Sequence, residues 1–185
     1  MITTIAFLGP AGTFTEAAVH KFAAHLPEVE TMPVGSPSEA VAAVRAGQAE
    51  YACVAIENSV DGAVTTTFDA LVEGEPVQIY REVDIPVAFS IMTRPDAEDI
   101  KRLSTHPVAF QQIRGWVKEH LPEVEFVPAS SNAAAAEAVA RGEADAAAAP
   151  ARAVEIFGLE TIAQGVADIK GAATRFVLVG RPGCL

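Results

Sequence analysis

A hexapeptide that occurs twice is the feature of this chain that most restricts its fold. His-Leu-Pro-Glu-Val-Glu stands at 25–30 and again, unchanged, at 120–125, a shift of 95 residues. The same frame aligns further pairs: Pro33 with Pro128, Ser36 with Ser131, Val44 with Val139, Gly47 with Gly142, Ala49 with Ala144, Ile5 with Ile100 and Leu8 with Leu103. Six consecutive identities flanked by matched Pro, Ser and Gly exceed what chance supplies, even in an Ala-rich chain. The repeat therefore predicts two similar lobes.

Each lobe has the pattern of a small α/β layer structure. In the first, a strand at 2–8 is broken by Gly9-Pro10-Ala11-Gly12, and a helix follows from 13 or 14 to about 24. A short strand follows 25–30. Ser36 and Pro37 then begin a helix that stops at Gly47, and a buried strand occupies 51–56. This order predicts a mostly parallel sheet covered by helices.

Two extended segments are predicted to cross between the lobes. The first runs from about 77 to 92, and the second is the strand at 174–179. We expect lobe one at about 1–78 with part of the C-terminal return, and lobe two at about 79–180. A chain that leaves one lobe, completes the other and returns late is typical of type II periplasmic-binding-protein folds, with a ligand cleft between the lobes.

Composition excludes several classes of protein. The 185 residues carry a net charge of −11, which argues against a nucleic-acid surface and offers no basic stripe to a membrane. The first apolar run, at 5–8, is broken at once by Gly9-Pro10 and has no basic flank, so neither a signal peptide nor a membrane helix is predicted and a cytoplasmic protein is expected. Cys53, Cys184 and the four histidines show no ligand spacing, so no metal is predicted.

The strand at 176–179 is apolar on both faces, and Thr174-Arg175 stands directly before it. A strand of this kind belongs inside a sheet, so its polar pair lies at the sheet's end, where sites are often built. The plainer alternative is that Thr174 simply begins a strand and Arg175 lies on a surface.

The turn at 9–12 has two interpretations as well: a tight strand-to-helix connection, or an anion site at a helix N-terminus.

Five segments in order closely resemble the signature motifs of the prephenate dehydratases, of the actinobacterial type. They are Gly9 to Glu16, Ile56 to Val64, Thr105-His106-Pro107 with Gln111-Gln112, Ser130 to Ala135, and Thr174-Arg175-Phe176. Together they extend over nearly the whole chain. The resemblance implies a lyase of phenylalanine biosynthesis that converts prephenate to phenylpyruvate, carbon dioxide and water, with prephenate as its small-molecule partner and no cofactor.

The resemblance also implies the site. Thr174 takes the catalytic role, donating a hydrogen bond or proton to the departing hydroxyl. Glu57 is expected either to feed a proton relay or to be a structural carboxylate that caps the turn before Gly62. Asn58 is the third predicted catalytic residue, with an amide suited to orient hydroxyl and ketone oxygens. Arg175 is expected to clamp a carboxylate, with a salt bridge at the hinge as the plainer alternative. Phe14 and Phe176 are expected to form a dry wall, with core packing as the plainer alternative for both. The remaining predicted substrate-binding residues are Thr13, Ser59, Gln112, Ser131, Asn132, Ala133 and Ala134. Each of these polar residues could instead be a simple turn or cap.

Two departures from the family pattern stand out. Many members carry an Asn shortly before Thr-Arg-Phe, whereas Lys170-Gly171-Ala172-Ala173 has none. The sequence also stops at Leu185, where the family usually continues into a phenylalanine-sensing ACT domain, so a catalytic domain alone is expected.

Three other functions are alternatives to a prephenate dehydratase. They are a prephenate decarboxylase that keeps the hydroxyl, an arogenate dehydratase, and a non-catalytic protein that binds a small acid. A homodimer or homotetramer is possible on family grounds.

Overall fold

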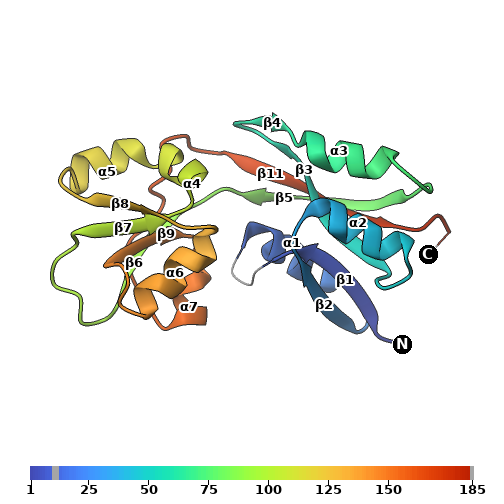
Figure 1. Cartoon of the computed structure of the whole chain (residues 1–185), viewed down its shortest axis with the longest axis horizontal. Coiled ribbons are helices and arrows are strands. Elements are labelled where there is room, and N and C mark those ends of the chain that lie inside the picture. The colour runs from blue at the N-terminus through green and yellow to red at the C-terminus, as the bar shows by residue number, and fades with distance from the viewer. Residues whose placement is uncertain (10–12, 184–185) are drawn as a thin grey trace. The chain divides into compact units, whose positions relative to one another are not determined.

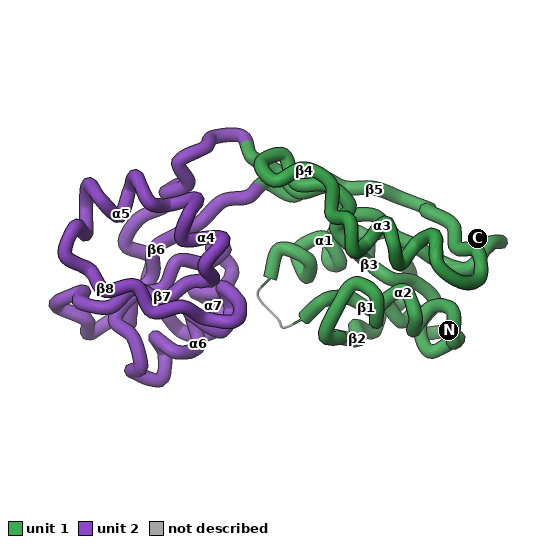
Figure 2. The backbone as a smooth tube through the Cα atoms, turned by 45° about the horizontal axis from the view of Figure 1, so that its top comes forward, with its two compact units in different colours: residues 1–86, 172–185 green, residues 87–171 purple. Residues whose placement is uncertain are grey.

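Two sheets, one in each of two units, organise the chain (Figure 1). The computed structural model describes residues 1–9 and 13–183, so Pro10, Ala11 and Gly12 of the predicted turn and Cys184 lie outside the described residues. Unit 1 comprises residues 1–86 and 172–185, and unit 2 comprises 87–171 (Figure 2). The predicted boundary at residue 79 differs from this division because the strand at 78–86 pairs within the sheet of unit 1.

Unit 1 contains a six-stranded sheet of order β2-β1-β3-β11-β5, with the short β4 on β3. Its elements are β1 (Thr3–Leu8), α1 (Phe14–Ala23), β2 (Val29–Val34), α2 (Pro37–Arg45), β3 (Tyr51–Asn58), β4 (Gly62–Ala63), α3 (Thr65–Val72), β5 (Gln78–Pro86) and β11 (Ala173–Gly180). β1 is parallel to β2 and β3, whereas β11 runs antiparallel between β3 and β5. The last strand of the chain thus lies inside the sheet of unit 1.

The sheet of unit 1 is buried on both faces, which explains the unbroken apolar run of β11. Phe176 and Leu178 belong to the cluster under α1, together with Phe7 and Ile85. Val177 and Val179 belong to the cluster that α2 and α3 cover. Consecutive side chains of a strand point to opposite faces, so a strand inside two layers is apolar throughout.

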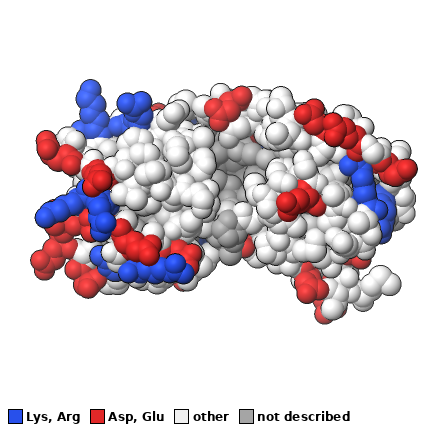
Figure 3. Space-filling view, in the orientation of Figure 1, with Lys and Arg blue, Asp and Glu red and all other residues white. Residues whose placement is uncertain are grey.

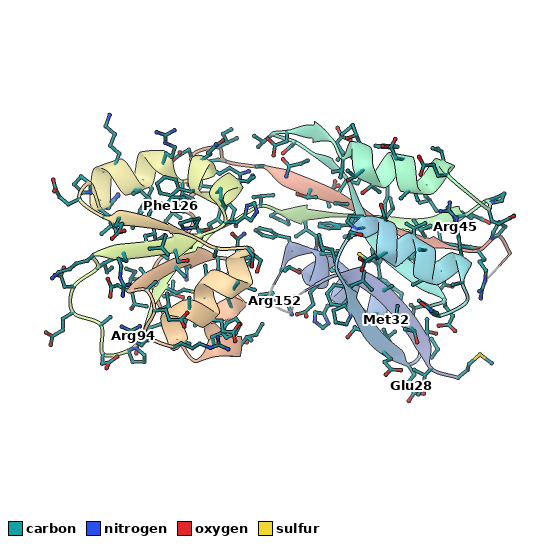
Figure 4. The ribbon with its side chains drawn as sticks, viewed as in Figure 1. Glu28, Met32, Arg45, Arg94, Phe126 and Arg152 are labelled. Atoms are coloured by element: carbon teal, nitrogen blue, oxygen red, sulfur yellow. The ribbon has the colours of Figure 1, made fainter. Side chains whose placement is uncertain are left out.

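Arg45 joins α2 to the end of α3. Its guanidinium donates hydrogen bonds to the carbonyl oxygens of Ala70 at 2.8 Å, Leu71 at 3.2 Å and Glu75 at 2.8 Å (Figure 4). The last carbonyls of a helix have no partner within it, so a side chain that satisfies them stabilises the helix end.

Unit 2 contains a five-stranded sheet of order β10-β6-β9-β7-β8. Its elements are β6 (Ser90–Thr93), β7 (Arg102–Thr105), α4 (Pro107–Gln112), α5 (Arg114–His120), β8 (Glu125–Pro128), α6 (Asn132–Ala140), β9 (Ala146–Ala149), α7 (Ala153–Phe157) and β10 (Glu160–Ala163). β9 consists of four fully buried alanines, of which Ala147 and Ala149 pack in one cluster with α6. Two α/β units of similar design confirm the predicted fold class.

The repeat holds in three dimensions, with one correction. Tyr51 and Ala146 are equivalent in the 95-residue frame, and the strand register places Ile5 beside Tyr51 and Leu103 beside Ala146. Ile5 therefore corresponds to Leu103, a shift of 98 residues, so the upstream matches with Ile100 and Leu103 in the first frame were wrong. The connection through α1 and the one through α4 and α5 differ by three residues, which shifts the frame.

A second repeat, with a shift of 87 residues, relates β6 to β11. Gly180 pairs with Tyr51 as Thr93 pairs with Ala146, so Arg181 is the equivalent of Arg94. Both arginines precede a proline, and they donate to matched carbonyls, Arg181 to Val44 and Arg94 to Val139. Each unit thus receives an equivalent fourth strand, but from a different place in the chain.

Thr67 provides a stability test. Its side chain is 0 % exposed, and its Oγ1 has no hydrogen-bond partner among the described residues. A buried hydroxyl without a partner costs free energy, so Thr67→Val, which keeps the shape, should leave the free energy of unfolding unchanged or raise it by up to about 1 kcal/mol. Urea unfolding measures this. A loss larger than about 1 kcal/mol would show that Thr67 has a partner in solution.

Candidate active site

Thr174 and Asn58 meet at the end of the unit 1 sheet. Asn58 closes β3, Thr174 is the second residue of β11, and the two are directly paired. The Asn58 Nδ2 donates a hydrogen bond of 2.9 Å to the Thr174 Oγ1, and Thr174 is 8 % exposed. Two side chains that are 116 residues apart in sequence therefore form one polar pair.

A bulge in β3 produces this pairing. Arg175 lies opposite Glu57 and Phe176 lies opposite Ala55, so Ile56 is an additional residue in β3. One extra residue changes which side chains face each other beyond that point. Without the bulge Thr174 would lie opposite Glu57, and Asn58 would fall one position further along.

The orientation of the Asn58 amide is fixed by its oxygen. Oδ1 accepts hydrogen bonds from the backbone N–H groups of Val60 at 2.8 Å and Asp61 at 3.3 Å. The N–H groups of Val60 and Asp61 need an acceptor, so the amide oxygen must lie on their side. The NH₂ group then faces Thr174. Since Thr174 Oγ1 accepts from Asn58, its own O–H proton remains to be donated, and it has no acceptor among the described residues.

Ser59 holds the residue that precedes Thr174. Its Oγ accepts from the Ala173 N–H at 2.8 Å, and its own N–H donates to the Ala173 carbonyl at 2.9 Å. The backbone bond continues the β3–β11 ladder by one residue, and the bond to the side chain replaces the second ladder bond. They fix the backbone of the segment in which the sequence lacks the family's usual asparagine.

Arg175 lies on the other face of the sheet from Thr174. Its Nε is 3.2 Å from Asp84 Oδ1, and its Nη1 is 3.9 Å from Glu57 Oε2. The hydrogen bond that Arg175 donates to Asp84 and the negative charges of Asp84, Glu82 and Glu57 raise the pKa of Arg175, so the guanidinium stays charged at every working pH. The structure thus places Arg175 and Glu57 together and away from the Thr174 hydroxyl.

A concavity of about 140 Å³ lies beside these charges. It is lined by Glu57, Ser59, Asp84, Ala173 and Arg175, so two carboxylates are part of its wall.

Unit 2 gathers a second group of predicted residues at the start of α6. Ser131 caps the helix, its Oγ accepting from the Ala134 N–H at 2.9 Å. The Asn132 Oδ1 accepts from the Thr105 hydroxyl at 3.1 Å and the His106 N–H at 3.2 Å. Ala133 is buried, with its N–H in the first turn, where helices leave donors without an internal acceptor.

The remaining predicted residues are distributed between the units. Thr13 caps α1, accepting from the Glu16 N–H at 3.2 Å, and Phe14 packs partly buried against the cluster under α1. Phe176 is 2 % exposed in the same cluster, which is core packing. In unit 2, the Gln112 carbonyl accepts from the Asp168 N–H at 2.8 Å.

Other chemistry has little support among the described residues. They contain no group of three or more His, Cys, Asp or Glu that could hold a metal ion. Cys53 is buried, and burial raises the pKa of its thiol, which keeps it in the unreactive neutral form. Every helix among them is too short or too polar to cross a bilayer. Acidic and basic side chains are interspersed on the face drawn in Figure 3, without a continuous basic surface.

Asp84 and Thr105 contact predicted site residues but were not themselves predicted as site residues. Asp84 pairs with Arg175 across the strands, and Thr105 supports Asn132. Thr105 belonged to a motif that resembled the family, which was a usable signal. Asp84 had none, since its pairing depends on the register of β5 against β11.

Sequence and structure comparisons place these residues in a known group. The family described as "Prephenate dehydratase" matches residues 5–183. A prephenate dehydratase of Corynebacterium glutamicum is 55% identical over 183 residues, which are 96% of this chain and 58% of that protein. The chain thus spans less than two thirds of the length of this curated relative.

Two solved structures resemble the whole chain. Prephenate dehydratase from Arthrobacter aurescens, solved in complex with L-Phe, has a TM-score of 0.88 at 45% identity, over 98% of this chain and 60% of that one. A protein described as a quorum-quenching acylase, GqqA, has a TM-score of 0.80 at 33% identity, over 96% of this chain and 64% of that one. With a family match over residues 5–183, the chain belongs to the prephenate dehydratase family.

Proposed function

We propose that this chain catalyses the decarboxylation and dehydration of prephenate to phenylpyruvate. The observation that carries the proposal is the Asn58–Thr174 pair, which leaves one hydroxyl proton available at the end of the sheet. Family membership and the 55% identity to a prephenate dehydratase support the reaction. A cytoplasmic enzyme with a small-molecule substrate goes with this proposal.

The reaction sets the task of the site. The bond from the ring to its carboxylate breaks, its electron pair enters the ring, and the C–O bond at the opposite carbon breaks. Carbon dioxide and water leave, and the departing hydroxide takes up one proton. A donor placed at that oxygen stabilises the transition state, and correctly placed proton transfer contributes about 10²- to 10⁴-fold in rate.

Thr174 is the proposed donor at the leaving oxygen. The Asn58 NH₂ donates to the Thr174 oxygen, which stabilises the charge that develops when the hydroxyl gives up its proton. A threonine hydroxyl is a weak acid, so it must regain a proton in the same step. We propose that water supplies it, since Glu57 pairs with Arg175 on the opposite face of the sheet.

In unit 2, we propose that Asn132 and the first N–H groups of α6 bind a substrate carboxylate. Both hydrogen bonds of the Asn132 amide are accepted by its oxygen. The NH₂ group of the same amide has no partner among the described residues. The positive end of the α6 dipole favours an anion by about 0.3 to 1 kcal/mol. Ser131 keeps its structural role as the helix cap.

Arg175 is proposed to neutralise the carboxylates around it, in place of the carboxylate clamp expected from the sequence. Arg175→Ala would leave Glu57, Glu82 and Asp84 uncompensated and repel a doubly charged substrate. We expect the KM for prephenate to rise about tenfold at low salt and less at high salt. In the double variant Arg175→Ala/Asp84→Asn, most of this rise should disappear. A rise that persists in the double variant would establish direct binding by Arg175.

An assay on the wild-type chain tests the proposed function. Prephenate is added, and phenylpyruvate is followed by its absorbance in alkali, with arogenate as the comparison substrate. Phenylpyruvate formed faster than in buffer supports the proposal. A product that keeps its hydroxyl would establish a decarboxylase, faster turnover of arogenate an arogenate dehydratase, and binding without turnover a non-catalytic protein.

Acyl transfer, the activity in the description of GqqA, is less well supported by the geometry. A hydroxyl nucleophile needs an adjacent general base. Thr174 receives its hydrogen bond from an amide, and no His or carboxylate among the described residues is hydrogen-bonded to its hydroxyl. The pair is therefore arranged to donate a proton, and it lacks the base that would remove one.

A further inference from the structure

Thr105 is a fully buried hydroxyl at the end of β7, and it contacts Asn132. We propose that Thr105 is a positioning residue that orients the Asn132 amide for substrate binding, an inference that rests on the proposed function of Asn132. The Thr105 Oγ1 lies 3.1 Å from the Asn132 Oδ1 and 2.9 Å from the Ala148 carbonyl oxygen. Thr105 is 0 % exposed, so it acts on a ligand only through another residue.

Two donors converge on the Asn132 oxygen. The His106 N–H points at it from 3.2 Å, and the Thr105 hydroxyl shares its single proton between this oxygen and the Ala148 carbonyl. Rotating the amide by half a turn would place NH₂ against the His106 N–H, two donors facing each other. The amide is thereby held with its oxygen inward and its NH₂ outward, where the NH₂ has no partner among the described residues.

Removing one of the two donors weakens the preference of the Asn132 amide for this orientation. Without the Thr105 hydroxyl, a single bond from His106 holds the oxygen, and the terminal amide torsion is broad and nearly two-fold in its preferences. The NH₂ then spends part of its time turned away from the ligand. The expected loss is that of one net hydrogen bond, about tenfold in affinity.

Three variants separate positioning from packing. Thr105→Val keeps the shape and removes the hydroxyl, whereas Thr105→Ser keeps the hydroxyl. Thr67→Val is the matched control, because it removes an equally buried hydroxyl that lacks a partner among the described residues. We expect Thr105→Val to raise the KM for prephenate about tenfold with kcat within about twofold, and Thr105→Ser and Thr67→Val to stay near wild type. Urea unfolding of each variant sets conditions in which all are folded.

Coupling to Asn132 gives the decisive comparison. If Thr105 acts through Asn132, Thr105→Val should add nothing to the KM of Asn132→Ala. The side-chain NH₂ signals of Asn132 in NMR spectra report orientation without any substrate, and in Thr105→Val they should move toward the values of a freely rotating amide.

The outcomes keep the two proposals separate. Unmoved NH₂ signals, or a Thr105→Val effect that remains in Asn132→Ala, would overturn the positioning role even if the wild type converts prephenate. Signals that move in a chain without dehydratase activity would support the orienting contact while the proposed function fails. An equal rise of the KM for prephenate in Thr67→Val would show that the effect of Thr105→Val comes from general packing.

Discussion

Thr174→Val is expected to abolish most of the turnover of prephenate while leaving its binding intact. The substitution removes the one hydroxyl whose proton the Asn58 amide leaves free, and it keeps the shape of a side chain that is 8 % exposed. Proton donation at the leaving oxygen is made in the transition state only, so kcat should fall about 10²- to 10⁴-fold. The dissociation constant for prephenate, measured by calorimetry, should stay within about threefold of wild type.

Two controls accompany this variant. Thr174→Ser keeps a hydroxyl at the same position and should retain activity within about tenfold of wild type. Thr67→Val removes a buried hydroxyl elsewhere in unit 1 and should leave kcat unchanged. If Thr174→Val turned over prephenate at the rate of Thr67→Val, Thr174 would have no part in the chemistry.

Asn58→Asp is the second change with a large expected effect. The carboxylate keeps an oxygen for the N–H groups of Val60 and Asp61, so the turn should survive. Its other oxygen, however, accepts where the amide donated, and it draws the Thr174 proton toward itself. We expect kcat to fall about 10²-fold at neutral pH, with the free energy of unfolding little changed.

The same variant predicts a dependence on pH. Once protonated, the carboxyl group introduced by Asn58→Asp can again donate to Thr174. The protonated fraction grows about tenfold for each pH unit below neutrality until the pKa is reached, about 3.9 for an unperturbed aspartic acid. The ratio of variant to wild-type kcat should therefore rise from pH 8 to pH 5. A ratio that stays constant over this range would contradict the role assigned to the Asn58 NH₂.

The two-lobe fold followed from the sequence because its signal was a repeat. Six identical residues at 25–30 and 120–125 fixed one frame, and the elements downstream of each copy agree with it. The 95-residue frame does not hold for β1 and β7, because the connection that follows β1 is three residues longer than the one that follows β7. The relation of β6 to β11 was also missed, although Phe89, Arg94 and Pro95 match Phe176, Arg181 and Pro182 in the 87-residue frame.

The composition of the candidate site was easier to predict than its geometry. Alternation along a strand already implied that Thr174 and Arg175 face opposite sides. What no pattern revealed was the extra residue Ile56, which brings Asn58 opposite Thr174 and leaves Glu57 with Arg175. A bulge of one residue depends on the packing of both strands, so a local sequence does not specify it.

The stoichiometry of the wild-type reaction tests the central claim most directly. Carbon dioxide released and phenylpyruvate formed from prephenate are measured together, at early times and at completion. If Thr174 assists the loss of the hydroxyl as the carboxylate leaves, the two products appear in equal amounts throughout. Carbon dioxide in excess, with a product that retains the hydroxyl, would contradict the account.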